Sequence, residues 1–219
     1  MFRNTMRIDR KAFIIFFATF LVTAGITLST LAEGKETGGI KGIIKAKKVK
    51  YVKHCVVYID TVPNNFEPPQ DHVVMDQKNM TFIPHVLPVI KGTTVDFLNS
   101  DEVQHNIYSP DAVADHMNLG TWLKGEKRSF TFNTLGIATI LCNVHSDMLA
   151  YILVLQNPYF AVVNKDGSFA LSNIPEGKYV LKLWNPRAKK SFWGKQIKAE
   201  DQQIEIHAGS VTTVTFQLQ

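Results

Sequence analysis

Four side chains with metal-binding atoms occur in a fixed order along this chain of 219 residues. Cys142, His145 and Met148 lie within the run CNVHSDM, and His105 lies upstream in NSDEVQHNIYSP. One thiolate, two imidazoles and one thioether are an unusual set of donors. A trigonal site of two histidines and one cysteine, with a weak axial methionine, is typical of copper centres that transfer single electrons. The sequence therefore predicts one such copper ion per chain, held by these four residues.

The spacing of Cys142, His145 and Met148 predicts a tight loop. Three donors so close together cannot all point to one side from a strand or a helix, whereas a loop at the end of a β-barrel can turn them inward. The fourth donor must then come from a different strand, and we expect His105 at the end of that strand. The runs IATILC and AYILVL are expected to be the strands that anchor the loop on either side.

Each type of ligand has a physical role. Cys142 binds as the thiolate and releases its proton when the metal enters. The two histidines supply neutral ring nitrogens, and the soft thioether of Met148 tolerates Cu(I) and tunes the reduction potential. A stiff scaffold would give Cu(I) and Cu(II) nearly the same geometry, so that little rearrangement accompanies the gain or loss of an electron.

The histidine rings need hydrogen-bond partners that fix their orientation. Asn106, adjacent to His105, is the candidate that would connect the two ligand segments. Asn99 and Asp101 are alternatives, although the formation of a turn is their simpler explanation.

Each of these residues taken alone has an ordinary interpretation. Met148 would more often pack in a core, and His105 would more often be a plain strand-end histidine. The joint order of the four donors is what indicates a metal site, and a structural zinc site would rarely use methionine. A second candidate cluster contains His116 and Met117 near Asp111 and Asp115, for which a solvated loop is the simpler interpretation.

The N-terminus has the pattern of a secretory signal peptide. Basic side chains precede an apolar run from Ala12 to about Leu28, and Thr30-Leu31-Ala32 supplies a cleavage site of small residues. We expect residues 1–32 to be removed after Ala32 and the protein to be periplasmic or secreted. The alternative is an uncleaved membrane anchor, although the apolar run is short for a span and contains several threonines.

The charge balance indicates no nucleic-acid partner. Four basic side chains and one acidic side chain lie in residues 1–32, so the rest of the chain carries only about +2 of the formal charge of +5. A group of lysines between Lys45 and Lys53 would suit an acidic partner, but a solvated strand face is the simpler interpretation.

The two cysteines need separate interpretations. In an exported protein an even number of cysteines first suggests a disulfide. A bond between Cys55 and Cys142 would leave His105, His145 and Met148 together without a purpose. We therefore expect Cys55 to be a buried free thiol that behaves as a small hydrophobic residue.

The chain after the signal peptide is predicted to be all-β. Its strand-like segments are short, rich in β-branched and aromatic residues, and separated by turn residues: VVYI, TTVDFLN, RSFTFN, IATILC, AYILVL, KYVLKLW, QIEIH and TVTFQLQ. Asp166-Gly167 predicts a hairpin turn, and GGIKGIIKAKKVKYVKHCVVYID predicts a further pair of strands. Many short strands with frequent turns favour sandwiches or barrels.

Residues 72–156 resemble a cupredoxin. The resemblance is carried by FIPHVLPVIKGTTVDFLNSD, the HN of His105, GEKRSFTF and GIATILCNVHSDMLAYILVL, and the C-x2-H-x2-M loop is similar to that of the amicyanins. It implies a Greek-key β-barrel or sandwich with copper as the cofactor, in which the backbone N–H of Asn106 reaches the thiolate. Val144 and Ser146 flank His145, where better-known cupredoxins usually have a proline.

The tail resembles a smaller carboxypeptidase regulatory-like, or transthyretin-like, β-sandwich. DGSFALSNIPEGKYVLKLW carries this resemblance, and GGIKGII and VVYID fit the two strands that open such a module. The chain would then contain a discontinuous sandwich, residues 35–66 and 157–219, with a cupredoxin domain of residues 70–156 inserted into it. The whole resembles exported bacterial proteins of methylamine-utilisation-like type.

Three functions fit these patterns. The first is a blue-copper electron carrier that shuttles between a redox protein and its acceptor, such as a cytochrome or a periplasmic oxidoreductase. The second is a copper-binding or copper-delivery protein, and the third is a cell-envelope binding module with structural copper. No hydrolytic motif occurs, and the extra histidine pairs of multicopper oxidases are missing, so the sequence does not predict an enzyme.

Overall fold

The structure is a computed structural model that describes residues 36–187 and 199–218. The predicted signal peptide, residues 1–32, and its cleavage after Ala32 lie outside the described residues. Within the described ranges, no helix is long and apolar enough to cross a membrane.

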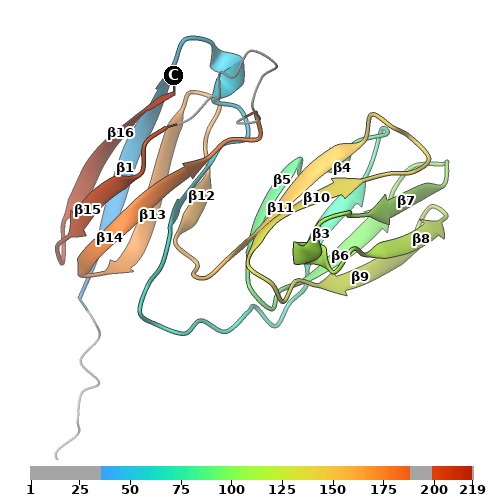
Figure 1. Cartoon of the computed structure of the whole chain (residues 1–219), viewed down its shortest axis with the longest axis horizontal. Coiled ribbons are helices and arrows are strands. Elements are labelled where there is room, and N and C mark those ends of the chain that lie inside the picture. The colour runs from blue at the N-terminus through green and yellow to red at the C-terminus, as the bar shows by residue number, and fades with distance from the viewer. Residues whose placement is uncertain (1–35, 188–198, 219) are drawn as a thin grey trace, which may run out of the picture. The chain divides into compact units, whose positions relative to one another are not determined.

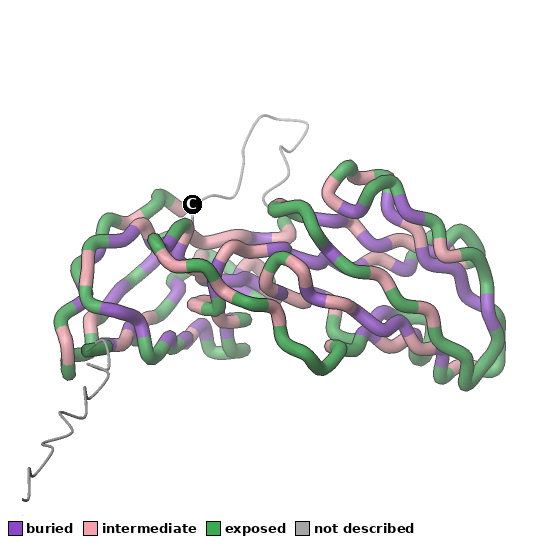
Figure 2. Tube along the Cα trace, turned by 90° about the horizontal axis from the view of Figure 1, so that it is seen from below, coloured by how far each residue is buried: buried purple, intermediate pink, exposed green. Residues whose placement is uncertain are grey.

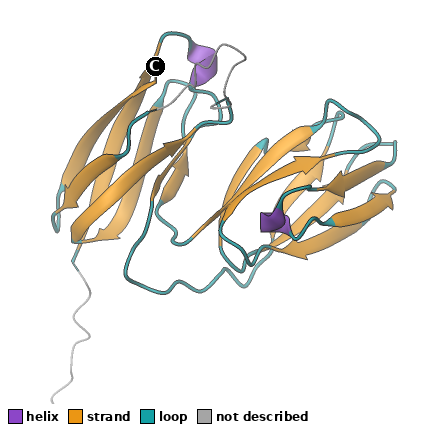
Figure 3. Cartoon of the chain, viewed as in Figure 1, coloured by secondary structure: helices purple, strands orange, loops and turns teal. Residues whose placement is uncertain are grey.

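The described residues are all-β, as predicted from the sequence (Figures 1 and 3). Their regular helical elements are two short 3₁₀ turns, η1 (Val49–Tyr51) and η2 (Ala112–Ala114). The strands are β1 (Thr37–Ala46), β2 (Val56–Ile59), β3 (Val73–Gln77), β4 (Phe82–Ile83), β5 (Val86–Ile90), β6 (Thr94–Asn99), β7 (His105–Tyr108), β8 (Asn118–Trp122), β9 (Lys127–Thr131), β10 (Gly136–Leu141), β11 (Leu149–Leu155), β12 (Phe160–Val162), β13 (Ser168–Pro175), β14 (Gly177–Trp184), β15 (Gln202–Ile206) and β16 (Val211–Leu218).

Strands β3 to β11 form two sheets that enclose one hydrophobic core. The first sheet has the strand order β4-β3-β6-β9 and the second has the order β5-β11-β10-β7-β8. The pairs β3–β6 and β11–β5 are parallel, and the other pairs in these sheets are antiparallel. Large side chains from both sheets, such as Phe97, Trp122 and Ile152, meet in the core between them.

Apolar and polar side chains alternate along most of β6, so one face of the strand packs in the core and the other faces away from it. Val95 and Phe97 point inward and are fully buried. Asp96 points to the other face, where its carboxylate accepts hydrogen bonds from Lys127 Nζ at 2.6 Å and Ser129 Oγ at 2.6 Å, both on β9. These bonds hold the pKa of Asp96 far below its ordinary value, against the opposing effect of burial.

The remaining strands form a second pair of sheets with a core of their own. One sheet has the order β13-β1-β16 and the other the order β12-β2-β14-β15. Buried and exposed residues alternate along β15 and β16 (Figure 2), which places Ile206 and Phe216 in the core between the two sheets. β1 is central in the first sheet because it pairs antiparallel with β13 and parallel with β16.

Two glycines of β1 are required by close approaches of other chain segments. A Cβ atom on Gly42 would lie 2.3 Å from the Phe169 ring, and one on Gly38 would lie 2.5 Å from the carbonyl oxygen of His207. The G-x-x-x-G spacing in TGGIKGII therefore lets β1 fit between its two neighbours.

Two predicted hairpins are wrong in their pairing. β1 and β2 lie in different sheets, and so do β12 and β13 on either side of Asp166-Gly167. The turn itself is present, because Gly167 has a φ of 90° and its N–H donates to the carbonyl oxygen of Asn164 at 3.0 Å. The local turn residues predicted a change of direction, but burial of the apolar faces decides that each connection crosses from one sheet to the other.

The two places where the chain enters and leaves the β3–β11 segment lie together. The Gln156 side chain accepts a hydrogen bond from Val62 N at 3.1 Å and donates to the carbonyl oxygens of Val62 and Asn64. Asn157 Nδ2 donates to the carbonyl oxygen of Ile59 at 2.9 Å. We propose on this basis that residues 35–66 and 157–219 form one discontinuous domain, into which residues 70–156 are inserted.

Removal of the inserted segment tests this proposal. A shortened chain in which a Gly-Ser linker of about six residues replaces residues 69–155 should fold, because the two junctions already lie side by side. A fragment of residues 157–219 alone should not fold, because it lacks the central strands β1 and β2 and leaves their neighbours unpaired. Dispersion of NMR amide signals distinguishes the outcomes, and a folded tail fragment would contradict the discontinuous domain.

The Asp96 network predicts a stability that depends on pH. Asp96→Asn should lower the free energy of unfolding by about 1–3 kcal/mol at pH 7, because charge-assisted hydrogen bonds to Lys127 and Ser129 are lost. A carboxyl whose pKa is depressed on folding stabilises the protein above its unfolded pKa of about 4 and loses this effect as the pH falls. Urea unfolding at pH 7 and pH 2.5 should show the difference shrinking in acid, with the exposed Asp71→Asn as the control. An equal difference at both pH values would argue against this origin.

Candidate metal centre

The predicted ligands lie at one end of the β3–β11 sandwich. His105 is the first residue of β7, Cys142 follows the last residue of β10, and Met148 precedes the first residue of β11. The prediction that His105 ends a strand is therefore wrong in detail, because β6 already ends at Asn99 and a loop connects it to β7.

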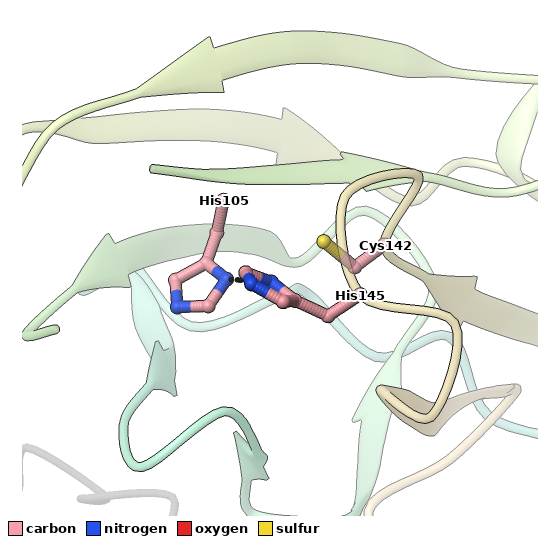
Figure 4. A group of neighbouring side chains, drawn as sticks. All are labelled: His105, Cys142 and His145. Carbon is pink, nitrogen blue, oxygen red and sulfur yellow. Dashed lines mark hydrogen bonds between the residues drawn. The ribbon is translucent and has the colours of Figure 1, made fainter. Parts of the chain in front are cut away.

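Strand pairing brings the two ligand segments together. β10 lies between β7 and β11 in one sheet, and Leu141 at its end is paired with Tyr108 on one side and Leu149 on the other. The loop from Cys142 to Met148 therefore starts and ends in neighbouring strands. Figure 4 shows the side chains of Cys142 and His145 pointing from this loop toward His105.

Three of the four predicted ligands form one cluster. The ligand atoms of His105, Cys142 and His145 all lie within 4.8 Å of one another. Nδ1 of His105 lies 3.1 Å from Nδ1 of His145, and the two rings meet edge to face with centroids 4.8 Å apart (Figure 4). His105 is fully buried and Cys142 is 4% exposed, whereas His145 is half-buried.

Met148 is buried in the same core as Cys142. Its side chain is 2% exposed, and its backbone N–H donates to the carbonyl oxygen of His145 at 3.1 Å, which closes the end of the loop. Met148 therefore lies at the end of the ligand loop with its side chain in the hydrophobic core.

The donor atoms suit a soft or borderline metal ion. Two ring nitrogens face each other at hydrogen-bond distance beside a thiol, so without a metal one of the nitrogens must carry a proton. The backbone N–H of Asn106 points at Cys142 Sγ from 3.5 Å, which is an interaction that stabilises a thiolate. Two imidazoles and one thiolate suit copper, whereas ions such as magnesium and calcium prefer oxygen ligands.

Asn106 connects the ligand segments, as the sequence predicted. Its Oδ1 accepts a hydrogen bond from the backbone N–H of Asn143 at 3.3 Å, one residue after Cys142. Its Nδ2 donates to Asn118 Oδ1 at 2.9 Å and to the carbonyl oxygen of Gly120 at 2.8 Å, both on β8. The ligand loop is therefore tied through one buried side chain to β7 and β8. The resemblance also implied the contact from Asn106 N–H to the thiol, and this contact is present.

Asn99 and Asp101 build the loop that leads to His105. Asn99 Nδ2 donates to the carbonyl oxygens of Val103 and Trp122, and the Asp101 carboxylate lies 2.9 Å from His105 Nε2. Burial by itself raises the pKa of Asp101. Hydrogen bonds from the backbone N–H of Met80, the His105 ring and the backbone N–H of Asn79 outweigh this effect, so the pKa of Asp101 is lowered.

The second candidate cluster is a loop, as its simpler interpretation predicted. His116 Nδ1 bonds the carbonyl oxygen of Pro110 at 2.6 Å, Met117 is buried in the core, and Asp111 accepts a hydrogen bond from the Thr139 N–H. Among residues 36–187 and 199–218, three or more histidine, cysteine or acidic side chains bring their ligand atoms together in one place. That place is the group of His105, Cys142 and His145.

Both cysteines are free and buried, which confirms the prediction for Cys55. Cys55 lies in the core of the other pair of sheets, where its Sγ donates to the carbonyl oxygen of Tyr51 at 3.3 Å. Burial raises the pKa of the Cys55 thiol to about 12. Cys55 therefore stays a neutral thiol at physiological pH.

Comparison with known proteins assigns the segment that holds the cluster. Residues 69–155 match the family of copper binding proteins of the plastocyanin/azurin type. The comparison with curated proteins gives no match.

Among solved structures, a reduced Cu(I) form of an amicyanin variant is 23% identical, with a TM-score of 0.37, and the match covers 45% of this chain and 97% of that chain. An oxidised amicyanin variant is 24% identical, with a TM-score of 0.36 and coverage of 43% and 96%. A copper-containing nitrite reductase from Thermus scotoductus is 23% identical, with a TM-score of 0.38 and coverage of 44% and 28%.

The family match and the cluster together assign the cofactor. Residues 69–155 carry the match to a copper-binding family, and the same residues contain the two imidazoles and the thiol that suit copper. Copper is therefore the cofactor, and the residues that match the copper-binding family are the ones that contain this cluster.

Proposed function

We propose that this protein is a type 1, or blue, copper protein that transfers single electrons between redox partners. His105, Cys142, His145 and Met148 would hold the ion, with the cysteine as thiolate and the methionine as a weak thioether donor. When bound there, copper alternates between Cu(I) and Cu(II) and so takes up and gives up one electron.

The observation that carries the proposal is the convergence of the donor atoms on a rigid scaffold. His105, Cys142 and His145 already lie within 4.8 Å of one another in side chains fixed by strand pairing and by Asn106. A site held by its surroundings changes little between oxidation states, which favours rapid electron transfer over uptake and release of the metal.

The chain's own groups protect and tune the site. Complete burial of His105 and near-complete burial of Cys142 exclude water from the thiolate. The Asn106 N–H aimed at the sulfur withdraws charge from the thiolate and holds it in one position. An ion held by these four side chains would have no position left for a substrate, which supports an electron carrier and not an enzyme.

The half-buried His145 supplies the route for electrons to the surface. The four loops at this end of the sandwich each expose one large apolar side chain, at 47–58% exposure: Met80, Val103, Leu123 and Val144. Hydrogen bonds and an ion pair join these loops, among them Met80 N–H to Asp101 and Lys124 to Glu102. Exposed apolar side chains on the loops at the same end of the sandwich as the half-buried His145 suit brief docking of a redox protein such as a cytochrome or a periplasmic oxidoreductase.

The location and the second sandwich extend the proposal. The N-terminal pattern of residues 1–32 supports export to the periplasm or secretion, where a copper carrier would meet such partners. We infer that the discontinuous sandwich of residues 35–66 and 157–219 is of carboxypeptidase regulatory-like type. The motif DGSFALSNIPEGKYVLKLW and the glycines of β1 support this inference. The combination supports a composite protein of methylamine-utilisation-like type.

Replacement of Cys142 tests the blue-copper centre. The purified copper-loaded oxidised protein should be intensely blue, and Cys142→Ser should remove the visible absorption, because the charge-transfer band needs the thiolate sulfur. Cys55→Ser is the matched control, since its hydroxyl can still donate to Tyr51, and this variant should stay blue. A colourless wild type that binds Cu(I) and exchanges it rapidly would instead indicate copper delivery. An unchanged visible spectrum in Cys142→Ser would contradict the proposed copper centre.

Two substitutions of Met148 separate an axial ligand from a core residue. Met148→Gln should keep the colour and lower the reduction potential, because an oxygen donor favours Cu(II). Met148→Leu keeps an apolar side chain of similar volume but offers no donor, so the potential should rise. Protein-film voltammetry measures both changes. Shifts in the same direction, or none, would assign Met148 to packing alone.

A further inference from the structure

The Asp101 carboxylate forms a hydrogen bond with the ring of His105, a proposed copper ligand. Its Oδ2 lies 2.9 Å from His105 Nε2, with the His105 side chain fully buried and the Asp101 side chain 14% exposed. Asp101 lies in the loop that connects β6 to β7, four residues before His105 at the start of β7. Asp101 itself lies outside the cluster of converging ligand atoms formed by His105, Cys142 and His145.

This bond decides which ring nitrogen faces the metal. An ionised carboxylate only accepts hydrogen bonds, so Nε2 of His105 must carry the ring proton. The other nitrogen, Nδ1, is then unprotonated and points toward Nδ1 of His145 at 3.1 Å. A neutral imidazole can bind a metal only through its unprotonated nitrogen, so Asp101 selects the binding form of the ring.

Asp101 is held in place by a turn on a different strand pair. Its Oδ1 accepts the backbone N–H of Asn79 at 2.6 Å, and its Oδ2 accepts that of Met80 at 2.8 Å. Both residues have left-handed backbone conformations, with φ of 54° and 53°, in the turn that joins β3 to β4. Successive N–H groups that converge in this way form an anion-binding nest, and a left-handed methionine is uncommon.

We propose that Asp101 is a positioning residue for His105 and lowers the reduction potential of the copper centre. The carboxylate fixes the tautomer and the orientation of the ring, and its negative charge makes the imidazole a stronger donor. A stronger donor stabilises Cu(II) more than Cu(I). The β3–β4 turn sets this bond through the N–H groups of Asn79 and Met80. The inference rests on the proposed function, because it takes His105 as a copper ligand.

The metal-free protein provides the first test. Nitrogen-15 NMR of the histidine side chains should show His105 in a single tautomer with the proton on Nε2. In Asp101→Asn the ring should lose this single form, because the amide can donate as well as accept. A wild-type His105 with its proton on Nδ1 would overturn the inference, and this measurement needs neither copper nor a folded variant.

Copper affinity provides the second test. Chelator competition on Asp101→Asn should show a loss of Cu(II) affinity of about 10–100-fold and a smaller loss of Cu(I) affinity, so that the reduction potential rises. Glu102→Gln is the matched control. It removes the same charge one residue away, from an exposed side chain whose partner is Lys124, and both affinities should change less than about twofold.

The outcomes separate this inference from the proposed function. A purely structural role for Asp101 would lower the melting temperature and reduce both copper affinities by the same factor, and that result would overturn the positioning role. A wild type that never becomes blue would instead defeat the electron-transfer proposal. The histidine tautomer in the metal-free chain would still report on the bond between Asp101 and His105.

Discussion

The pairing of β10 with both β7 and β11 is the constraint on which the copper site depends. Leu141 is matched with Tyr108 on one side and with Leu149 on the other. Cys142 therefore leaves its strand beside the strand that begins at His105, and the loop must return within a few residues to enter β11. The pairing of β10 with β7 and β11 therefore brings His105 close to Cys142 and to the loop that carries His145.

Buried polar side chains convert this approximate approach into a defined geometry. Asn106 lies between the ligand loop and β8, Asn99 closes the loop that precedes His105, and Asp101 bonds the ring itself. These groups bond backbone atoms and the His105 ring, and Asn106 also bonds the Asn118 side chain. Satisfied polar networks of this kind make a site rigid, because any displacement would leave a buried donor or acceptor unpaired.

Both β-sandwiches contain pairs of consecutive strands and pairs of strands that lie far apart in the sequence. In the β3–β11 segment, β10 and β11 form an adjacent antiparallel pair around the ligand loop. In the other segment, β1 pairs with β13 and β16, far away in the sequence. Long-range pairing of this kind explains how a continuous segment can sit between two halves of one sandwich, provided that its ends lie together as they do at Gln156 and Val62.

The sequence determined the class of the fold and indicated the proposed metal donors. Alternating apolar residues and β-branched runs gave the strands around Cys142, because side chains on a strand point to opposite faces with a period of two. The order of His105, Cys142, His145 and Met148 indicated copper through the chemistry of the donors alone. Asn106 was also readable, because its neighbour is a ligand and its side chain can bond in two directions.

Only the tertiary structure decided the strand partners and the role of Asp101. A turn signal such as Asp166-Gly167 specifies where the chain bends, but the burial of two apolar faces determines whether the next strand pairs or crosses to the opposite sheet. In the sequence, Asp101 is an aspartate of the kind that commonly forms turns. Its bond to His105 exists because the β3–β4 turn, more than twenty residues earlier, aims the N–H groups of Asn79 and Met80 at the carboxylate. The sequence named Asp101 only as one alternative ring partner, because its contacts with Asn79 and Met80 form only when separate strands pack into one sandwich.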